Sequence, residues 1–224
     1  MPAVPEPASA PAPRLTPART ALAIIVVLSC AGLGALAARY LLHARGAEPI
    51  VQSAAVYPRP RVLAPFALVA DNGHPFDMQS LSGHWSLVFF GYTACPDLCP
   101  ATLALLAQVD SKLADLPTEL RPHVLMITVD PQRDDPAKLG AYVRFFAPSF
   151  QGLTGAPGAV ADAAAAFGVA YRRGSDSGGG YAVDHSAAVY LVDPDARLRA
   201  VFMPPQQTAL LASDYRAIVA ARAR

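Results

Sequence analysis

The chain has 224 residues, of which 53% are hydrophobic and 16% charged, and its formal net charge is +1. This length leaves room for one folded domain with accessory segments. No cluster of Lys and Arg is interleaved with aromatic residues, so the sequence lacks the basic stripe that nucleic-acid binding requires. Three cysteines are too few for a disulfide framework. Two of them lie close together, and we expect these two to form a working site.

The N-terminal part divides into a tail and an apolar segment. Residues 1–19 contain six prolines and no aromatic residue, so we expect a disordered tail. No charged residue occurs from Thr20 to Ala38, and about 20 apolar residues suffice for a helix that crosses a bilayer. We therefore predict a single transmembrane anchor over residues 20–42. Prolines in residues 43–61 predict a linker between this anchor and the domain.

The apolar segment leaves two alternatives open. Val27–Cys30 loosely resembles a bacterial lipobox, which would make Cys30 a lipidated N-terminus, and Ala35–Ala37 could be a cleavage signal. Arginines flank the segment on both sides, so their count hardly fixes its orientation. A short tail followed by a large domain favours a bacterial inner-membrane protein with its domain in the periplasm. The arginines and few acids of the tail also fit a mitochondrial presequence, and therefore the mitochondrial inner membrane.

From residue 62 onward, apolar strands alternate with helical patterns. Residues 66–78 read as a hairpin with an Asn-Gly turn. Further strands are expected over residues 85–92, 124–129, 187–192 and 198–202, and helices over residues 103–116, 137–146, 158–167 and 208–221. This order of elements predicts an α/β, thioredoxin-like sandwich over residues 62–224. Its working turn should lie at the carboxyl end of a buried strand.

Cys95 and Cys99 lie where the strand over 85–92 turns into a helix, in the segment GYTACPDLCP. Proline is tolerated at the first helical position, so Pro100 predicts that Cys99 is the helix N-cap or precedes it. Both sulfurs should then lie near the positive end of the helix dipole, which favours thiolates. Three residues separate the cysteines, one more than in dithiol oxidoreductases. This spacing suits chelation of a metal at least as well as a disulfide.

His185 is the candidate for a third donor. It follows a Gly-rich segment, Gly174–Gly180, and we expect it to begin a strand at the sheet edge that carries the cysteine turn. Two thiolates and one imidazole form a trigonal site for Cu(I), and with one further ligand they accept Cu(II). Zn(II) would accept the same donors, but structural zinc usually takes four protein ligands.

Three segments together resemble the Sco/SenC family of copper-binding proteins with a thioredoxin fold: Gly91–Pro100, Thr128–Asp134 and Val183–Ser186. The resemblance covers most of residues 62–224. It implies a membrane-anchored domain that binds copper through Cys95, Cys99 and His185. It further implies a partner, cytochrome c oxidase subunit II, to whose dinuclear copper site the protein delivers copper or whose cysteines it reduces. Other copper chaperones and thiol reductants are further candidate partners.

Two functions remain in competition. The leading interpretation is a copper metallochaperone, in which Cys95 and Cys99 must be reduced before copper can bind. The alternative is an enzyme, a thiol–disulfide oxidoreductase that uses the same cysteines as a redox pair and binds metal incidentally. The alternative predicts that dithiol exchange survives the loss of His185. A peroxiredoxin-like peroxidase is disfavoured, because the segment before Cys95 lacks the Thr-x-x-Cys spacing and the preceding proline of those enzymes.

Overall fold

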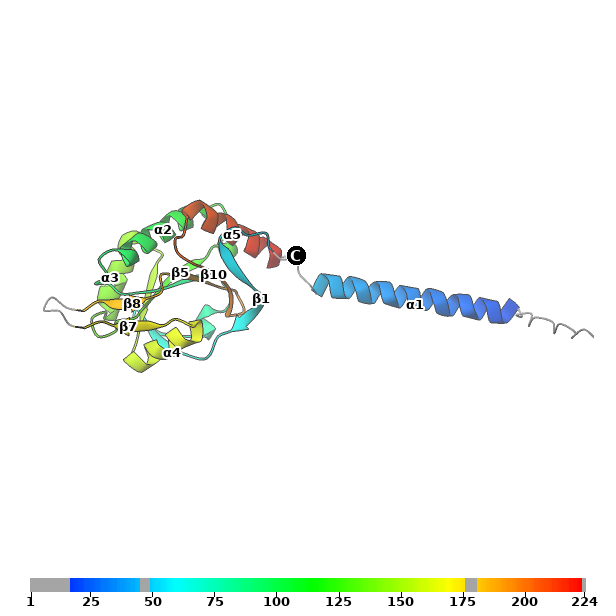
Figure 1. Cartoon of the computed structure of the whole chain (residues 1–224), viewed down its shortest axis with the longest axis horizontal. Coiled ribbons are helices and arrows are strands. Elements are labelled where there is room, and N and C mark those ends of the chain that lie inside the picture. The colour runs from blue at the N-terminus through cyan, green and yellow to red at the C-terminus, as the bar shows by residue number, and fades with distance from the viewer. Residues whose placement is uncertain (1–16, 45–48, 176–180, 223–224) are drawn as a thin grey trace, which may run out of the picture. The chain divides into compact units, whose positions relative to one another are not determined.

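The computed structural model describes residues 17–44, 49–175 and 181–222, which fall into an N-terminal unit and a larger unit that begins at Glu48. The N-terminal unit holds helix α1 (Pro17–Ala44), drawn in blue in Figure 1. Within the described residues, no helix is long and apolar enough to cross a membrane, so the anchor predicted over 20–42 is not confirmed. The tail predicted over 1–19 lies outside the described residues, except for its last three residues, which are helical.

The larger unit combines an eight-stranded sheet, a two-stranded ribbon and α-helices on both faces of the sheet. Its elements in chain order are β1 (Ala54–Val62), β2 (Ala67–Ala70), β3 (Pro75–Asp77), the 3-10 helix η1 (Gln79–Leu81), β4 (Ser86–Gly91), α2 (Leu98–Lys112), the 3-10 helix η2 (Thr118–Leu120), β5 (His123–Thr128), α3 (Pro136–Phe146), β6 (Gln151–Thr154), α4 (Pro157–Phe167), β7 (Tyr171–Arg173), β8 (Val183–His185), β9 (Val189–Val192), β10 (Arg197–Phe202) and α5 (Thr208–Arg222). The strand order of the sheet is β1-β10-β9-β4-β5-β6-β2-β3.

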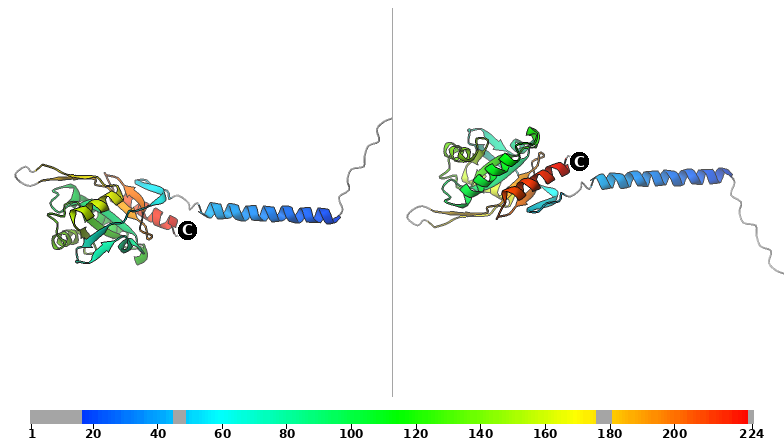
Figure 2. Two further views of the ribbon diagram at one scale, coloured as in Figure 1. Left: turned by 90° about the horizontal axis from the view of Figure 1, so that it is seen from below. Right: turned by 90° about the horizontal axis from the view of Figure 1, so that it is seen from above.

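The centre of the sheet is buried on both faces. Strands β4, β5 and β6 are parallel, and Phe89 on β4 pairs with Met126 on β5 and with Val189 on the antiparallel β9. All six residues of β4 are buried, as its uninterrupted apolar sequence predicts. Helices α2 and α5 lie side by side over one face, and α4 lies on the other (Figures 1 and 2). This arrangement confirms the predicted α/β sandwich.

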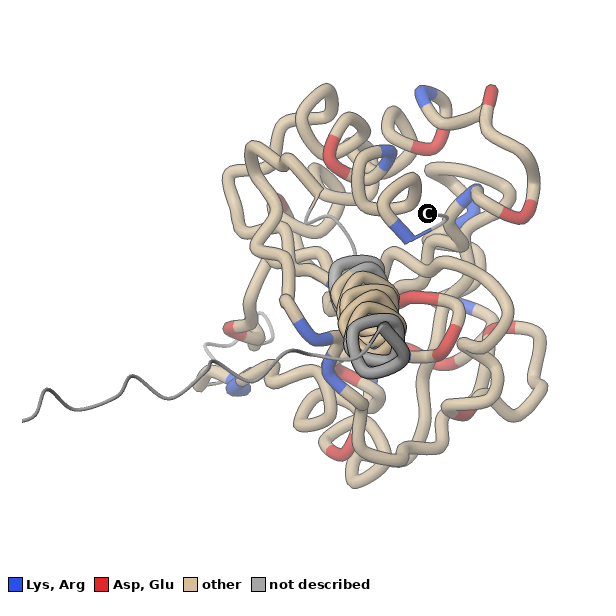
Figure 3. Tube along the Cα trace, turned by 90° about the vertical axis from the view of Figure 1, so that its right-hand side faces the viewer, with Lys and Arg blue, Asp and Glu red and all other residues tan. Residues whose placement is uncertain are grey.

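Charged residues of both signs are interspersed along this unit, as Figure 3 shows. Several of them pair across the fold: Arg144 contacts Asp71 at 2.6 Å, and Arg222 contacts Asp193 at 2.9 Å. These pairs place charges of opposite sign next to each other, which agrees with the net charge near zero.

One strand occupies the C-terminal part of the predicted linker. Residues 54–61 were expected to be a linker, but they belong to β1, which pairs antiparallel with β10 at the edge of the sheet. An edge strand tolerates Pro58 and Pro60, because an amide that faces outward has no partner to lose. The carboxylate of Asp214 on α5 fixes the start of this strand by accepting hydrogen bonds from the backbone N–H groups of residues 52–54 at 2.7–2.9 Å.

Candidate metal centre

The cysteine turn follows the carboxyl end of β4. Cys95 lies in the turn, where its N–H donates to the carbonyl of Tyr92 at 3.2 Å. Helix α2 begins at Leu98 with Asp97 as its N-cap, so Cys99 is the second helical residue and Pro100 the third. The prediction that Cys99 is the N-cap or precedes it is therefore wrong by two residues. All the amides of the first helical turn lack an intrahelical acceptor, so the fold tolerates proline at the third position as well as at the first.

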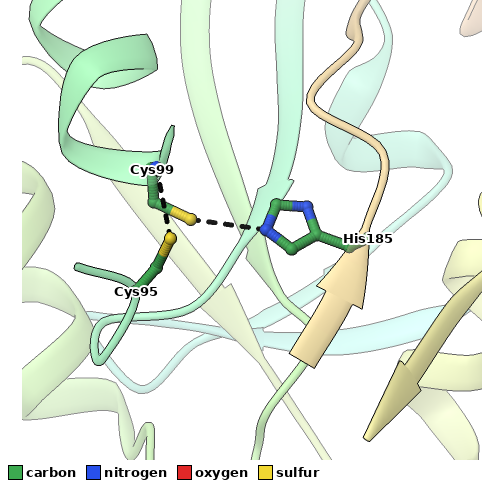
Figure 4. A group of neighbouring side chains, drawn as sticks. All are labelled: Cys95, Cys99 and His185. Atoms are coloured by element: carbon green, nitrogen blue, oxygen red, sulfur yellow. Dashed lines mark hydrogen bonds between the residues drawn. The ribbon is translucent and has the colours of Figure 1, made fainter. Parts of the chain in front are cut away.

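The structure brings the three predicted donors together. The Sγ atoms of Cys95 and Cys99 and a ring nitrogen of His185 all lie within 4.8 Å of one another, and both cysteines are free thiols. The closest approach that involves the histidine is 3.4 Å, between Cys99 Sγ and His185 Nε2 (Figure 4). With metal–sulfur bonds of about 2.3 Å, a planar three-coordinate ion separates its donors by roughly 4 Å. The spacing observed therefore fits one ion held by three donors.

His185 does not reach the site in the way the sequence predicts. It ends β8, which pairs with β7 in a separate two-stranded ribbon rather than in the main sheet. Its Nδ1 atom lies 3.0 Å from the carbonyl oxygen of Ser186. A carbonyl oxygen only accepts, so Nδ1 carries the proton, and the lone pair of Nε2 faces Cys99. Burial lowers the pKa of His185 and favours the neutral form, which is the form that binds metals.

The two cysteines differ in their electrostatic surroundings. Burial of Cys95 opposes ionisation, but polar contacts with the side chain and the N–H of Cys99 and with the N–H of Asp97 outweigh it and lower the pKa of Cys95. Cys99 is completely buried, and burial raises the pKa of its thiol. The expectation that both sulfurs favour the thiolate therefore fails for Cys99, because loss of solvation outweighs the field at the helix end.

Aromatic rings and an open hollow surround the donors. The rings of Tyr92 and Phe89 meet the ring of His185 edge to face, with centroids 5.8 and 6.0 Å away. A hollow of about 330 Å³ opens beside the donors. Its lining consists of Tyr92, Cys95, Pro96, Asp97, Leu98, Ala182, Val183, Asp184 and His185. Solvent and a partner's side chain can thus reach Cys95 and His185, whereas Cys99 lies beneath them.

Asp134 fixes the cysteine turn, and its role was not recognised from the sequence. This carboxylate is fully buried and accepts hydrogen bonds from the N–H of Thr93 at 2.9 Å, from the hydroxyl of Thr93 at 2.5 Å and from the hydroxyl of Thr128 at 2.7 Å. Its position soon after the buried strand β5, at the same sheet edge as the cysteines, is the sequence signal that could have identified it.

Known proteins resemble this chain over most of its larger unit. The SCO1/SenC family model matches residues 55–220. The SCO2-like protein of Rickettsia conorii is 35% identical over 178 residues, which make up 78% of this chain and 85% of that protein. The mitochondrial SCO2 homolog of Mus musculus is 43% identical over 131 residues, 58% of this chain and 51% of that protein. The crystal structure of Arabidopsis thaliana ScoI with copper bound matches with a TM-score of 0.66 at 30% identity, covering 72% of this chain and 98% of that chain.

Proposed function

This chain belongs to the SCO1/SenC family, and on that premise we propose that it is a copper metallochaperone that acts in the assembly of cytochrome c oxidase. It binds one copper ion as cargo, through the thiolates of Cys95 and Cys99 and the Nε2 atom of His185. The observation that carries this proposal is the convergence of these three donor atoms within 4.8 Å.

The donor set suits an ion that must be passed on. Thiolates are soft ligands and select Cu(I) among the available metals, while the imidazole is also a good copper ligand. The hollow beside Cys95 and His185 leaves room for a donor atom of a recipient to approach the ion. A site with three protein donors can accept this fourth donor before it releases the ion. The same opening allows one further ligand, which Cu(II) would require.

We propose cytochrome c oxidase subunit II as the recipient, as membership of the family implies. The protein either delivers copper to the dinuclear copper site of this subunit or keeps the cysteines of that site reduced. Both roles need the free thiols that Cys95 and Cys99 present. A thiol reductant and a copper donor upstream of this protein complete the scheme, because only reduced cysteines can take up the ion.

We also propose that the N-terminal segment holds the protein at the inner membrane, with the larger unit on the periplasmic side. The support is the uncharged stretch from Thr20 to Ala38, whose apolar side chains are exposed on α1 from Ile24 to Leu36. Extraction of membranes with alkaline carbonate tests the attachment, and protease treatment of spheroplasts tests the side. Incorporation of labelled palmitate that is lost in Cys30→Ser would instead indicate a lipoprotein.

One observation favours the alternative, a thiol–disulfide oxidoreductase. Cys95 is partly exposed, and its pKa is lowered by hydrogen bonds despite the opposing effect of burial, whereas Cys99 is buried behind it. A reactive thiolate with a second thiol behind it is also the arrangement that dithiol exchange requires. In that case His185 would be dispensable for the main activity.

Copper titration of the full chain, reduced and in detergent, tests the proposal. Titration of Cu(I) against a competing chelator should give one ion per wild-type chain, and much weaker binding in Cys95→Ser, Cys99→Ser and His185→Ala. His74→Ala is the matched control, because His74 is an exposed histidine in the turn between β2 and β3. A reduced wild-type chain that takes up no copper would refute the metallochaperone.

A second arm of the experiment separates the two functions. Oxidase maturation is measured in cells that lack the protein and are complemented with each variant. Failure of His185→Ala to restore the dinuclear copper site supports copper transfer. Full restoration by His185→Ala, with the cysteine variants inactive, supports the oxidoreductase.

A further inference from the structure

The ribbon that carries His185 is poorly supported by its own strands. In the described part of the chain, β7 and β8 pair only with each other, over three residue pairs in which Tyr171 is opposite His185. An isolated two-stranded ribbon is at best marginally stable in water. Contacts outside the ribbon must therefore fix the distance between His185 and the two sulfurs, and the rings of Phe89 and Tyr92 supply two of them.

A further, directional contact is made by Tyr181, two residues before β8. Its hydroxyl donates a hydrogen bond of 2.7 Å to Oδ1 of Asp130, a buried carboxylate after β5. The other oxygen of Asp130 accepts a hydrogen bond from Nε of Arg133. The guanidinium groups of Arg133 and Arg173 lie over the ring of Tyr181 at 3.8 and 3.5 Å from its centroid. Two cation–π contacts and a charge-assisted hydrogen bond thus converge on one side chain.

The loop that accepts Tyr181 is also the loop that holds the cysteine turn. Asp134, four residues after Asp130, binds the N–H and the hydroxyl of Thr93. The hydroxyl of Thr128 connects the two acids, because it donates to Asp134 at 2.7 Å and accepts from the N–H of Asp130 at 3.0 Å. One short loop after β5 therefore fixes both the segment with the cysteines and the segment with the histidine.

We propose that Asp130, Arg133 and Tyr181 form a ribbon latch that positions His185 for copper. The latch does not contact the ion. It holds the ribbon in place and so determines how long the imidazole of His185 stays next to the two sulfurs. Opening the latch would withdraw Nε2 while leaving Cys95 and Cys99 in place, so the ion would be held by two thiolates and open to a recipient. This inference rests on the proposed function only where it concerns the release of copper.

Removal of one hydroxyl tests the latch. Tyr181→Phe keeps the ring between the two guanidinium groups but removes the hydrogen bond to Asp130. The reduced full chain should still bind one Cu(I), but it should release the ion to a chelator about tenfold faster, the factor expected for the loss of one hydrogen bond to a charged group. Tyr171→Phe is the matched control, because this tyrosine lies on the same ribbon and its hydroxyl donates no hydrogen bond to a described residue.

A metal-free measurement makes the test independent of copper binding. The N–H of Gly174 donates to the carbonyl of Ala182 at 2.8 Å and closes the ribbon. Its hydrogen exchange should be about tenfold faster in Tyr181→Phe than in wild type or Tyr171→Phe. The imidazole nitrogen signals of His185 should shift toward those of a solvent-exposed histidine. Arg133→Gln, which removes one guanidinium group from the ring of Tyr181, should change both measurements in the same direction.

The outcomes separate the latch from the proposed function. Wild-type exchange at Gly174 and unchanged His185 signals in both Tyr181→Phe and Arg133→Gln would overturn the latch, whether or not the chain binds copper. Faster exchange in these variants would support the latch even if the wild-type chain takes up no copper. That lack of copper uptake would refute the metallochaperone alone. Faster exchange with an unchanged rate of copper release would overturn the proposed control of release.

Discussion

The Sγ atom of Cys99 lies 3.4 Å from Nε2 of His185, although 86 positions separate the two residues in the chain. In the metal-free protein this contact is a hydrogen bond in which the thiol donates, because Nδ1 of His185 already donates to Ser186. In the proposed copper-bound form, the ion would take the place of the thiol proton between the same two atoms. The hydrogen bond keeps the buried thiol directed toward the imidazole of His185.

Gly91→Ala should displace the sulfur of Cys99. A Cβ atom at Gly91 would lie 3.0 Å from Cys99 Sγ and 2.7 Å from Cε1 of Phe89. Both neighbours are fully buried, so neither can move freely. We expect the free energy of unfolding to fall by about 1–3 kcal/mol, the usual effect of overpacking a core, and the affinity for Cu(I) to fall with it. Urea unfolding and chelator competition measure the two effects.

Gly158→Ala is the control for this substitution. A Cβ atom at Gly158 on α4 meets nothing within 4 Å, so we expect unchanged copper affinity and a gain in stability of up to about 1 kcal/mol. Equal stability and copper affinity in Gly91→Ala and wild type would show that the cysteine turn adapts to the extra methyl group.

Asp134→Asn should loosen the cysteine turn. The buried carboxylate serves two donors on Thr93 and one on Thr128, and an amide can offer only one oxygen to them. We expect the free energy of unfolding to fall by about 2–4 kcal/mol, together with weaker copper binding. Asp162→Asn, at an exposed site on α4, should change the stability by less than about 0.5 kcal/mol. Copper binding at wild-type strength in Asp134→Asn would contradict the positioning role.

The sequence predicted those parts of the fold that depend on local pattern. The apolar runs of β4 and β5 identified the buried centre of the sheet, and the hairpin of β2 and β3 followed from its Asn-Gly turn, where Gly73 has a φ of 83°. Strand β1 was missed because prolines are typical of linkers, and only pairing with β10 makes the segment a strand. Strand β6 has four residues of mixed polarity and is defined by its neighbours β5 and β2.

The donors of the candidate site were predicted from residue type and spacing, but their environment was not. The burial of Cys99 and the hydrogen bonds to Cys95 decide which sulfur ionises first, and both depend on the packed fold. The separate ribbon of His185 was also missed, because three residues of β8 carry little periodic signal. The role of Tyr181 depends on a contact with a carboxylate 51 positions away, which no local pattern reveals.

Tyr142→Phe and Tyr215→Phe should have opposite effects. The hydroxyl of Tyr142 on α3 is buried without a hydrogen-bond partner among the described residues, so its removal should leave the stability unchanged or raise it by up to about 1 kcal/mol. The hydroxyl of Tyr215 on α5 donates to the carbonyl of Leu120 at 2.7 Å. Its removal should cost about 1–2 kcal/mol of unfolding free energy. Urea unfolding of both variants measures the difference, and a larger loss in Tyr142→Phe would contradict the prediction.

A stacked pair of histidines should make the fold less stable in acid. His84, two residues before β4, and His123, the first residue of β5, stack with ring centroids 4.0 Å apart. Burial and the neighbouring charge of His123 lower the pKa of His84, and burial lowers the pKa of His123. Because the pKa values of both histidines are lowered in the folded protein, the unfolded chain binds more protons than the folded chain. The free energy of unfolding is therefore unaffected by the pair above the unfolded pKa of about 6.5 and decreases as the pH falls below it.

His123→Gln tests this prediction, because it removes one charge of the pair and leaves the other histidines of the chain in place. We expect the unfolding free energy of the wild type to fall between pH 7.5 and about 5.5, and the fall to be smaller in His123→Gln. Burial also lowers the pKa of His185, so the pH dependence of the wild type alone cannot be assigned to the stacked pair. The difference in pH dependence between the wild type and His123→Gln can be assigned to it. Unfolding curves in urea at both pH values give this difference, and identical pH dependence in both proteins would contradict the assignment to the stacked rings.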